Sequence, residues 1–455
     1  MTDKNIILVT IDALRADHLG FMGYQKNTSP HIDKIAEEGI YYSNAVANAP
    51  YTTASIKSML TSSLPLTPER YLPFPFHRPS LPKVLKKYGY STYCVHSNPW
   101  FTKYNFGHDF DYFLDPLEKS KKKQGGISLP RKLKKKVREV DTNYLNNALS
   151  NIKKSVVGVN LEKPYARADV ITDKVLNLIP KLDKERFFLW IHYMDVHEPY
   201  LPKNKEFNQK LVSNLMEKRS KSPASLSKDE KRLMKKLYDS EIRFVDRQVG
   251  EVWKVLNELN SENFLLIITS DHGDELGEHG HYGHVNRKVP AKLYEELLHI
   301  PFLLYDPEVD EKGENSELVS LTDLSPTVID AVGIKKPQSF LGKSVLDSAE
   351  NRKSVINQAI QCKDPNQLRY MKNGSKLFSY RKNGYKLIWR EDGGTKLYNL
   401  EKDPEENNNI VQKKAKIAEE LKEKLFTEID KLKENFSEAE RVKNKVNRLK
   451  KMKKI

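Results

Sequence analysis

The sequence predicts an α/β fold: a mostly parallel central sheet with helices on both faces, and a small antiparallel sheet near the C-terminus. Apolar runs of strand length recur along the chain, and amphipathic helical patterns separate them. Several runs are apolar at almost every position, as strands buried on both faces of a parallel sheet are. Near the C-terminus, the turn signals "NG" and "DGG" join strand-like runs, which is typical of antiparallel hairpins.

The alternation places the elements of a main domain in order. The first strand is the β-branched run "NIILVTI" at 5–11, and the helical spacing of "SPHIDKIAEEGI" follows it at 29–40. A helix is expected from Ser55, because apolar residues follow at Ile56, Met59 and Leu60. The remaining alternation gives strands at 90–97, 186–195 and 263–270, and helices at 168–182 and 241–260.

Polar insertions and a change of pattern divide the chain. A basic insertion covers about 117–165, and a second insertion at 208–233 indicates helices over the edge or mouth of the sheet. With 455 residues, the chain can build one large domain and a smaller one. We predict a large α/β domain at 1–365, a small antiparallel sheet region at 366–410, and a basic helical tail at 411–455.

The net charge of +16 is concentrated in two segments. Lys119–Arg138 contains ten Lys and Arg residues and no acid, and 430–455 contains ten against four acids. Basic appendages on a neutral body indicate attraction to a polyanionic substrate or an acidic membrane surface, with solvated loops as the plain alternative. We expect no specific nucleic-acid binding, because the insertion has no recognition motif and few aromatic residues.

Cysteine usage and hydropathy suggest a cytoplasmic protein. Two cysteines, Cys94 and Cys362, supply neither a disulfide framework nor a Cys-based metal site. No apolar run has the length of a signal peptide or a membrane span, so we expect a soluble chain.

Polar residues follow three of the predicted strands. Asp12 follows the first strand, His197 in "VHEPY" follows the strand at 186–195, and "DHGDELGEHGHYGH" opens with Asp271 and His272. Ligands of open parallel sheets bind past the carboxyl ends of the strands, so we expect these side chains at one edge. Two carboxylates and an imidazole suit Mn²⁺ or Zn²⁺, with Ca²⁺ or Mg²⁺ as alternatives. For Asp12 alone, helix capping is an equal alternative.

A hydroxyl-rich stretch lies in "APYTTASIKSMLTSSLP", residues 49–65. Thr52 and Thr53 lie where a loop turns into a helix, so either hydroxyl could cap the helix or act as a nucleophile. A metal ion beside such a hydroxyl would lower its pKa, and the helix N-terminus would stabilise an incoming anion. From the residues alone both roles stay open, and capping by Thr53 or Ser55 is the alternative to a nucleophilic hydroxyl.

These motifs together resemble the sulfatase family of the alkaline phosphatase superfamily. The resemblance covers roughly residues 4–410 and rests on the order of the motifs "NIILVTIDALRADHLGFMGY", "PYTTASIKSMLTS", "FFLWIHYMDVHEPYLP", "TSDHGDELGEHG", "LYEELLHIPFLLYDP" and "GYKLIWREDGGTKLYNLEKDPEENNNI". It implies an alkaline-phosphatase-like three-layer sandwich, with a small C-terminal antiparallel sheet subdomain.

The resemblance also implies roles for individual residues. It makes Asp12, Thr52, Asp271 and His272 the ligands of one divalent ion, with Mn²⁺ or Ca²⁺ ahead of Zn²⁺ or Mg²⁺. Thr52 falls on the nucleophile position, and His197 would protonate the leaving group or bind the anion. His284 lies where many members have a lysine, and His284 or His279 would bind the anion or assist the second step.

Departures from the family's pattern concern the nucleophile. Typical sulfatases mature a Cys or Ser to formylglycine in a C/S-x-P-x-R context, whereas this chain has Thr52, with Ala54 and Ile56 at the proline and arginine positions. A further lysine is replaced by Ser97 or Asn98. The pattern resembles the threonine-nucleophile branch, which includes lipoteichoic acid synthases and phosphoethanolamine transferases.

The sequence therefore predicts a metal-dependent hydrolase of sulfate or phosphate esters, acting on an anionic ester of a glycan or other polyanion. One alternative is a transferase that moves a phosphate-bearing group from a phosphodiester to a glycan. Another is a non-catalytic anion-binding protein on the same scaffold, against which the intact set Asp12, Asp271 and His272 argues.

Overall fold

The computed structural model describes most of the chain. It covers residues 2–66, 78–102, 106–116, 163–182, 186–258, 263–284, 291–347, 352–361 and 374–452, with side chains up to 434. The described residues therefore exclude the basic stretch Lys119–Arg138 and Cys362. The described side chains exclude Val442, Val446 and Leu449, which form a thin apolar stripe in the sequence of the basic helical tail.

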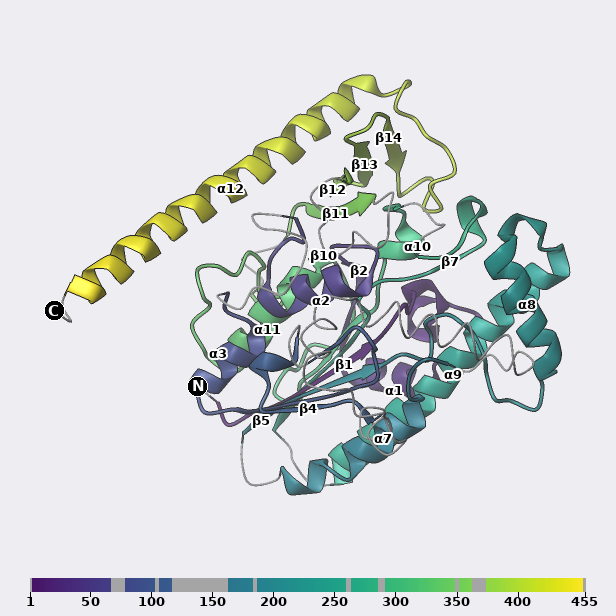
Figure 1. Ribbon diagram of the computed structural model, residues 1–455, viewed down its shortest axis with the longest axis horizontal. Helices are drawn as coiled ribbons and strands as arrows, with labels where there is room; N and C mark the ends of the chain where they lie inside the picture. Colours follow the sequence, from purple (N-terminus) through teal and green to yellow (C-terminus); the bar gives the residue numbers. More distant parts are fainter. Residues whose placement is uncertain are drawn as a thin grey trace, which may run out of the picture.

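A central sheet crosses the molecule (Figure 1), with eight strands in the described residues in the order β10-β2-β9-β6-β1-β5-β3-β4. The strands are β1 (Asn5–Ile11), β2 (Ile40–Val46), β3 (Ser91–His96), β4 (Tyr112–Leu114), β5 (Phe187–Tyr193), β6 (Phe264–Thr269), β9 (Phe302–Tyr305) and β10 (Gly313–Ser320). Only β9 among them runs antiparallel to its neighbours β2 and β6. This confirms the predicted, mostly parallel sheet.

Helices cover both faces of this sheet. In β1, Ile6 and Leu8 belong to one buried cluster, while Ile7 and Val9 belong to the other. The first cluster includes α2 (Thr52–Thr61), α3 (Leu81–Lys87) and α11 (Leu324–Ala331), and the second includes α1 (Pro30–Glu38), α7 (Ala168–Leu176), α8 (Gln209–Lys221) and α9 (Lys228–Glu258). Because side chains alternate between the two faces of a strand, a strand apolar throughout requires such a three-layer sandwich.

The C-terminal part forms a separate antiparallel sheet and a long helix. The sheet has the order β11-β12-β13-β14, with bounds Val355–Gln361, Ser375–Lys382, Tyr385–Arg390 and Thr395–Asn399. Its first strand, β11, precedes the expected boundary at residue 366. Helix α12 (Ala415–Met452) buries Leu421, Leu425 and Ile429 against this sheet, and its C-terminal half extends away from the rest of the chain (Figure 1).

Some element bounds differ from those expected. Helix α2 begins at Thr52, three residues before Ser55, and the second insertion ends inside α9, which begins at Lys228. Short elements complete the fold: β7 (Glu275–Leu276), β8 (Tyr282–Gly283) and α10 (Glu295–Leu298). In the described parts of the chain, no helix is both long and apolar enough to span a membrane.

Candidate metal centre and active site

Three buried side chains converge at the carboxyl edge of the central sheet. Asp12 directly follows β1, and Asp271 and His272 follow β6 after a single intervening residue. Since β1 and β6 are parallel neighbours, both strands end at the same edge. One ligand atom from each of the three residues lies within 4.8 Å of the others, and all three residues are fully buried.

The hydrogen bonding of these side chains fits a cation. Asp12 Oδ1 and Asp271 Oδ2 are buried without a hydrogen-bond partner. His272 Nδ1 donates to the carbonyl of Gly273 (2.7 Å), which leaves Nε2 as an acceptor, 3.6 Å from Asp271 Oδ2 and 3.8 Å from Asp12 Oδ1. Unpaired buried carboxylates are costly, so the donor set fits a divalent cation that prefers oxygen and imidazole ligands.

Electrostatics in the cluster are strongly coupled. Burial raises the pKa of the Asp271 carboxyl, and the negative charge of Asp12 raises it further. Burial also acts to raise the pKa of Asp12, but His197 and the hydrogen-bonded His192 outweigh it, so this pKa lies below its usual range. A pair of carboxylates with opposite shifts is expected where two like charges share one buried site.

Thr52 directs its hydroxyl into this cluster. It is the first residue of α2, and Tyr51, in extended conformation, occupies the N-cap position. Thr52 Oγ1 donates to Asp12 Oδ2 at 3.2 Å and lies 3.2 Å from His272 Nε2. The amides at the start of a helix have no intrahelical acceptor, so the same place favours an anion.

The alternative hydroxyls are placed differently. Ser55 Oγ donates to the carbonyl of Ala49 at 2.8 Å, away from the helix amides. Asn98, which with Ser97 is one of the two candidates for the position of the family's lysine, donates its Nδ2 to Asp12 Oδ2 at 3.3 Å. Among the hydroxyls considered, Thr52 is therefore the one that contacts the metal-ligand candidates.

Two further predicted histidines line up beside His272. The ring centroids of His272 and His284 are 4.5 Å apart, and those of His284 and His197 are 4.8 Å apart. His197 Nδ1 lies 2.6 Å from the carbonyl of Glu198, and His284 Nδ1 lies 3.1 Å from Asp274 Oδ1. Burial and, to a smaller extent, the neighbouring His272 lower the pKa of His284 to about 4. His284 is therefore neutral at pH 7 and does not carry the charge of the lysine it replaces.

His279 lies elsewhere in the same loop. Its Nε2 is 3.0 Å from Glu296 Oε1, and its ring stacks on Tyr294 with centroids 3.9 Å apart. The carboxylate of Glu296 beside the ring raises the pKa of His279. The structure thus brings Thr52, His197 and His284 together and leaves His279 apart, and the catalytic roles of all four stay predictions.

Two residues near the site were not predicted. His192 of β5 has Nδ1 2.7 Å from Thr10 Oγ1 and Nε2 3.4 Å from Asp12 Oδ2. Asp274 holds His284 and accepts a hydrogen bond from the hydroxyl of Tyr200 at 2.5 Å. The signals were a lone polar residue inside the apolar run "FFLWIHY" and a second acid in "DHGDELG".

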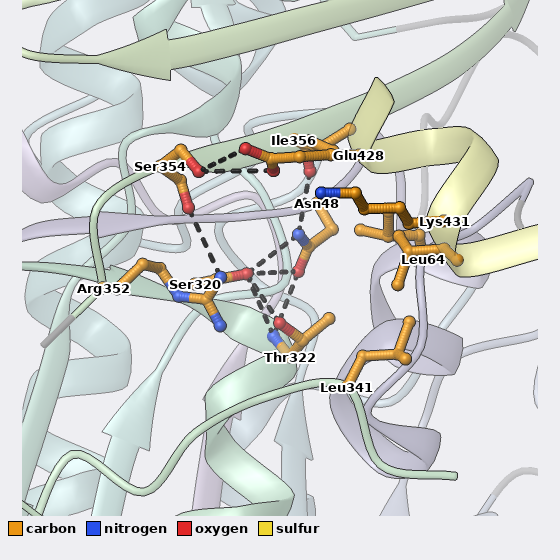
Figure 2. Close-up of a pocket in the computed structure, with 11 residues that line it drawn as sticks. Asn48, Leu64, Ser320, Thr322, Leu341, Arg352, Ser354, Ile356, Glu428 and Lys431 are labelled. Carbon is orange, nitrogen blue, oxygen red and sulfur yellow. Dashed lines mark hydrogen bonds between the residues drawn. The ribbon is translucent and has the colours of Figure 1, made fainter. Parts of the chain in front are cut away.

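A pocket of about 260 Å³ lies between α12 and the main domain (Figure 2). It is lined by Asn48, Leu64, Ser320, Thr322, Leu341, Arg352, Ser354, Ile356, Glu428, Lys431 and Leu432. None of the candidate metal or catalytic residues is among them. We therefore take the convergence of Asp12, Thr52 and His272, rather than the pocket, as the candidate site.

Comparison with protein families matches the model described as Sulfatase over residues 4–334. The chain belongs to the sulfatase family. A second family model, N-sulphoglucosamine sulphohydrolase, C-terminal, matches residues 277–435. These matches confirm the prediction that the chain belongs to the sulfatase family and is an enzyme of that family.

Individual relatives are distant but extend over nearly the whole chain. An arylsulfatase of Clostridium perfringens is 23% identical, and the match covers 92% of each chain. An N-acetylgalactosamine-6-O-sulfatase of Bacteroides thetaiotaomicron is also 23% identical, again over 92% of each. The crystal structure of a phosphonate monoester hydrolase of Agrobacterium radiobacter superposes with a TM-score of 0.67 at 16% identity, covering 94% of this chain and 96% of that one. The structural likeness confirms the alkaline-phosphatase-like fold.

Proposed function

We propose that this sulfatase-family chain is a metal-dependent hydrolase of sulfate or phosphate esters that uses Thr52 in place of formylglycine. The observation that carries the proposal is the position of the Thr52 hydroxyl. It lies 3.2 Å from both Asp12 Oδ2 and His272 Nε2, at the start of α2. A nucleophile needs this kind of placement, beside activating groups and beside a site that binds the anion.

The cation would be held by Asp12, Asp271 and His272, with Thr52 beside them. We expect Mn²⁺ or Ca²⁺ rather than Zn²⁺ or Mg²⁺. A divalent cation bound there would stabilise charge on the ester oxygens and lower the pKa of the Thr52 hydroxyl. The N-terminus of α2 would bind the non-bridging oxygens of the ester.

The first step forms an ester on Thr52. Thr52 Oγ1 attacks sulfur or phosphorus, and the bond from that atom to the alcohol oxygen breaks as the bond to Oγ1 forms. The hydroxyl proton passes to Asp12 Oδ2, its present acceptor. His197 gives a proton from Nε2 to the departing alcohol, because the Glu198 carbonyl at 2.6 Å occupies Nδ1.

The second step returns the enzyme to its starting state. Water attacks the sulfur or phosphorus atom of the threonine ester, and Oγ1 leaves with the proton held by Asp12. His284 accepts one proton from this water through Nε2, since its Nδ1 faces Asp274. The second water proton leaves with the sulfate or phosphate, and the two histidines re-equilibrate with solvent.

One observation favours a second candidate, a phosphodiester-dependent transferase acting on glycans. Thr52 cannot be oxidised to formylglycine, and Ala54 and Ile56 replace the residues of the maturation context. In this candidate, an acceptor alcohol takes the place of water in the second step. In both candidates the substrate is an anionic ester, and the relative named N-acetylgalactosamine-6-O-sulfatase supports a sulfated sugar.

A turnover panel tests the proposal. Metal-free protein is reloaded with Mn²⁺, Ca²⁺, Zn²⁺ or Mg²⁺ and assayed on an aryl sulfate, a phosphate monoester, a phosphodiester and a phosphonate ester. We expect cation-dependent release of alcohol from at least one ester. Release that requires an added glycan acceptor would identify the transferase instead. Full cation loading without turnover of any ester would reject both enzymes and favour the non-catalytic anion-binding protein.

A further inference from the structure

A short, partly buried segment holds the loop that carries His197. We call residues Lys163–Arg167 the strap and residues Asp195–Leu201 the His197 loop. Lys163 Nζ donates to the carbonyl of Asp195 at 2.6 Å, and the hydroxyl of Tyr165 donates to the carbonyl of His197 at 2.8 Å. Arg167 donates to the carbonyl of Leu201 at 3.1 Å. The strap therefore contacts the His197 loop at its start, middle and end.

A buried ion-pair network fixes the strap against α9. Glu241 Oε1 pairs with Lys163 at 2.7 Å, and Oε2 pairs with Arg167 at 3.1 Å. Glu241 Oε1 also accepts from the amide of Leu201 at 2.8 Å, and Arg167 lies 3.3 Å from Asp195 Oδ1. The side chains of Lys163 and Glu241 are 4% and 0% exposed, so loss of either partner would leave a buried charge unpaired.

The strap also contacts the loop after β3. Ser97 Oγ donates to the carbonyl of Ala166 at 2.8 Å, and the next residue, Asn98, reaches Asp12. Thus the strap links the loop beside the metal-ligand candidates to the loop of His197. In the sequence, the strap lies at the C-terminal end of the basic insertion, which covers about 117–165.

We propose that the strap is a positioning element for His197 and that Tyr165 is its main positioning residue. The Tyr165 hydroxyl fixes the peptide between His197 and Glu198, and the carbonyl of Glu198 in turn accepts from His197 Nδ1. The Glu198 carbonyl belongs to the next peptide, so Tyr165 acts on the direction of His197 Nε2 through two consecutive peptides. The inference rests on the proposed function of His197 as the acid for the leaving group.

Tyr165→Phe removes the hydroxyl alone, and Tyr90→Phe is its matched control. Tyr90 is also buried, and its hydroxyl donates to the carbonyl of Lys4 at 2.9 Å, away from the site. Protonation matters most for poor leaving groups. We expect Tyr165→Phe to lower kcat on an alkyl ester roughly tenfold to a hundredfold and on a 4-nitrophenyl ester only about twofold, with KM unchanged, since misplacement of a reacting group has this cost. Tyr90→Phe should leave the ratio of the two rates unchanged.

A second measurement is independent of turnover. We expect the ¹⁵N resonances of the His197 ring, assigned with His197→Gln, to shift or broaden in Tyr165→Phe and to stay unchanged in Tyr90→Phe. Unshifted His197 resonances in a folded Tyr165→Phe protein would overturn the inference, and so would equal losses of kcat on both esters. If the wild type turns over no ester, the proposed function fails, and the ring resonances alone decide whether the strap positions His197.

Discussion

At the scale of single residues, substitution of Thr52 best separates a helix-capping role from a catalytic role. Tyr51 holds the N-cap position, so a capping role for Thr52 has no support from the start of α2. We expect Thr52→Ala to lower turnover about a thousandfold or more, as loss of a nucleophile does in other hydrolases. Thr52→Ser should retain part of the activity because it keeps a hydroxyl.

Mass spectrometry of quenched enzyme should find sulfate or phosphate on the peptide that contains Thr52. Thr53→Ala is the matched control, because it alters the neighbouring hydroxyl of the same helix turn. If Thr52 were only a capping residue, Thr52→Ala would cost about 1 kcal/mol of stability and leave kcat intact. Wild-type turnover in that variant would transfer the nucleophile to another group.

The metal-ligand candidates allow a test by thermal unfolding as well as by metal content. Asp271 Oδ2 is buried without a partner, so Asp271→Asn should not lower the Tm of metal-free protein. Added Mn²⁺ or Ca²⁺ should raise the Tm of the wild type, because a ligand that binds the folded state stabilises it, but not that of Asp271→Asn. Asp246→Asn is the control: Asp246 is also buried, yet it accepts from the amides of His31 and Ile32. An equal response of both variants would contradict the site.

The candidate metal ligands could be predicted from the sequence because the ends of apolar strands can be recognised there. Asp12 and Asp271 follow apolar strands that end at one edge, so their convergence follows from the parallel arrangement. His192 could not be found in this way, since its position beside Asp12 depends on the register that pairs Thr10 with His192. Likewise, the same loop carries His279 and His284, and only the three-dimensional path of that loop separates their environments.

At the scale of elements, the predictability of a strand followed its hydrophobic pattern. The runs of β1, β5 and β6 are buried at nearly every position and were predicted. In contrast, β2 and β10 mix polar with apolar residues because β10 is an edge strand and is half exposed. Their apolar periodicity is too weak to distinguish them from loops.

The junction of the C-terminal sheet with the main domain depends on a buried lysine of β13. Lys386 is fully buried and pairs with Glu295 of α10 at 2.8 Å and with Glu406 at 3.1 Å. Lys386→Met would leave two carboxylates facing each other, so we expect a loss of about 3–5 kcal/mol in the free energy of unfolding. Urea denaturation measures this loss.

Lys376→Met on the neighbouring strand β12 is the control, because its pair with Glu391 is about half exposed. Exposed pairs contribute roughly 0–1 kcal/mol, so this variant should stay near the wild type. Equal, small effects of the two substitutions would show that the buried cluster does not hold the sheet to the main domain.

At the scale of the whole molecule, buried carboxyls set the pH dependence of stability. Burial raises the pKa of Glu198, Glu275 and Glu406 to about 7 each, and that of Asp195 to about 6. These groups bind more protons in the folded state than in the unfolded state, so their stabilisation is complete below about pH 4.5 and is lost as pH rises through about 7. We expect the Tm of metal-free protein to be higher at pH 5.5 than at pH 8. Glu275→Gln should reduce this difference, and a Tm that rises across the interval would contradict the prediction.

The distribution of charge over the whole chain predicts how the enzyme recognises its substrate. Lys119–Arg138 and 430–455 together account for the entire excess of +16, so the remainder of the molecule attracts an anion only locally. We expect a long polyanion to contact the basic segments as well as the active site, and a small aryl ester to contact the site alone. Attraction between exposed charges is screened over about 10 Å at 0.1 M salt. We therefore expect kcat/KM on a sulfated or phosphorylated glycan to fall severalfold between 50 and 200 mM NaCl, while kcat/KM on the aryl ester changes much less.

Replacing the ten Lys and Arg residues of Lys119–Arg138 by Ser should remove most of the salt dependence on the glycan and leave the aryl ester reaction unchanged. Parallel salt dependence for the two substrates would show instead that the basic segments are solvated and take no part in binding.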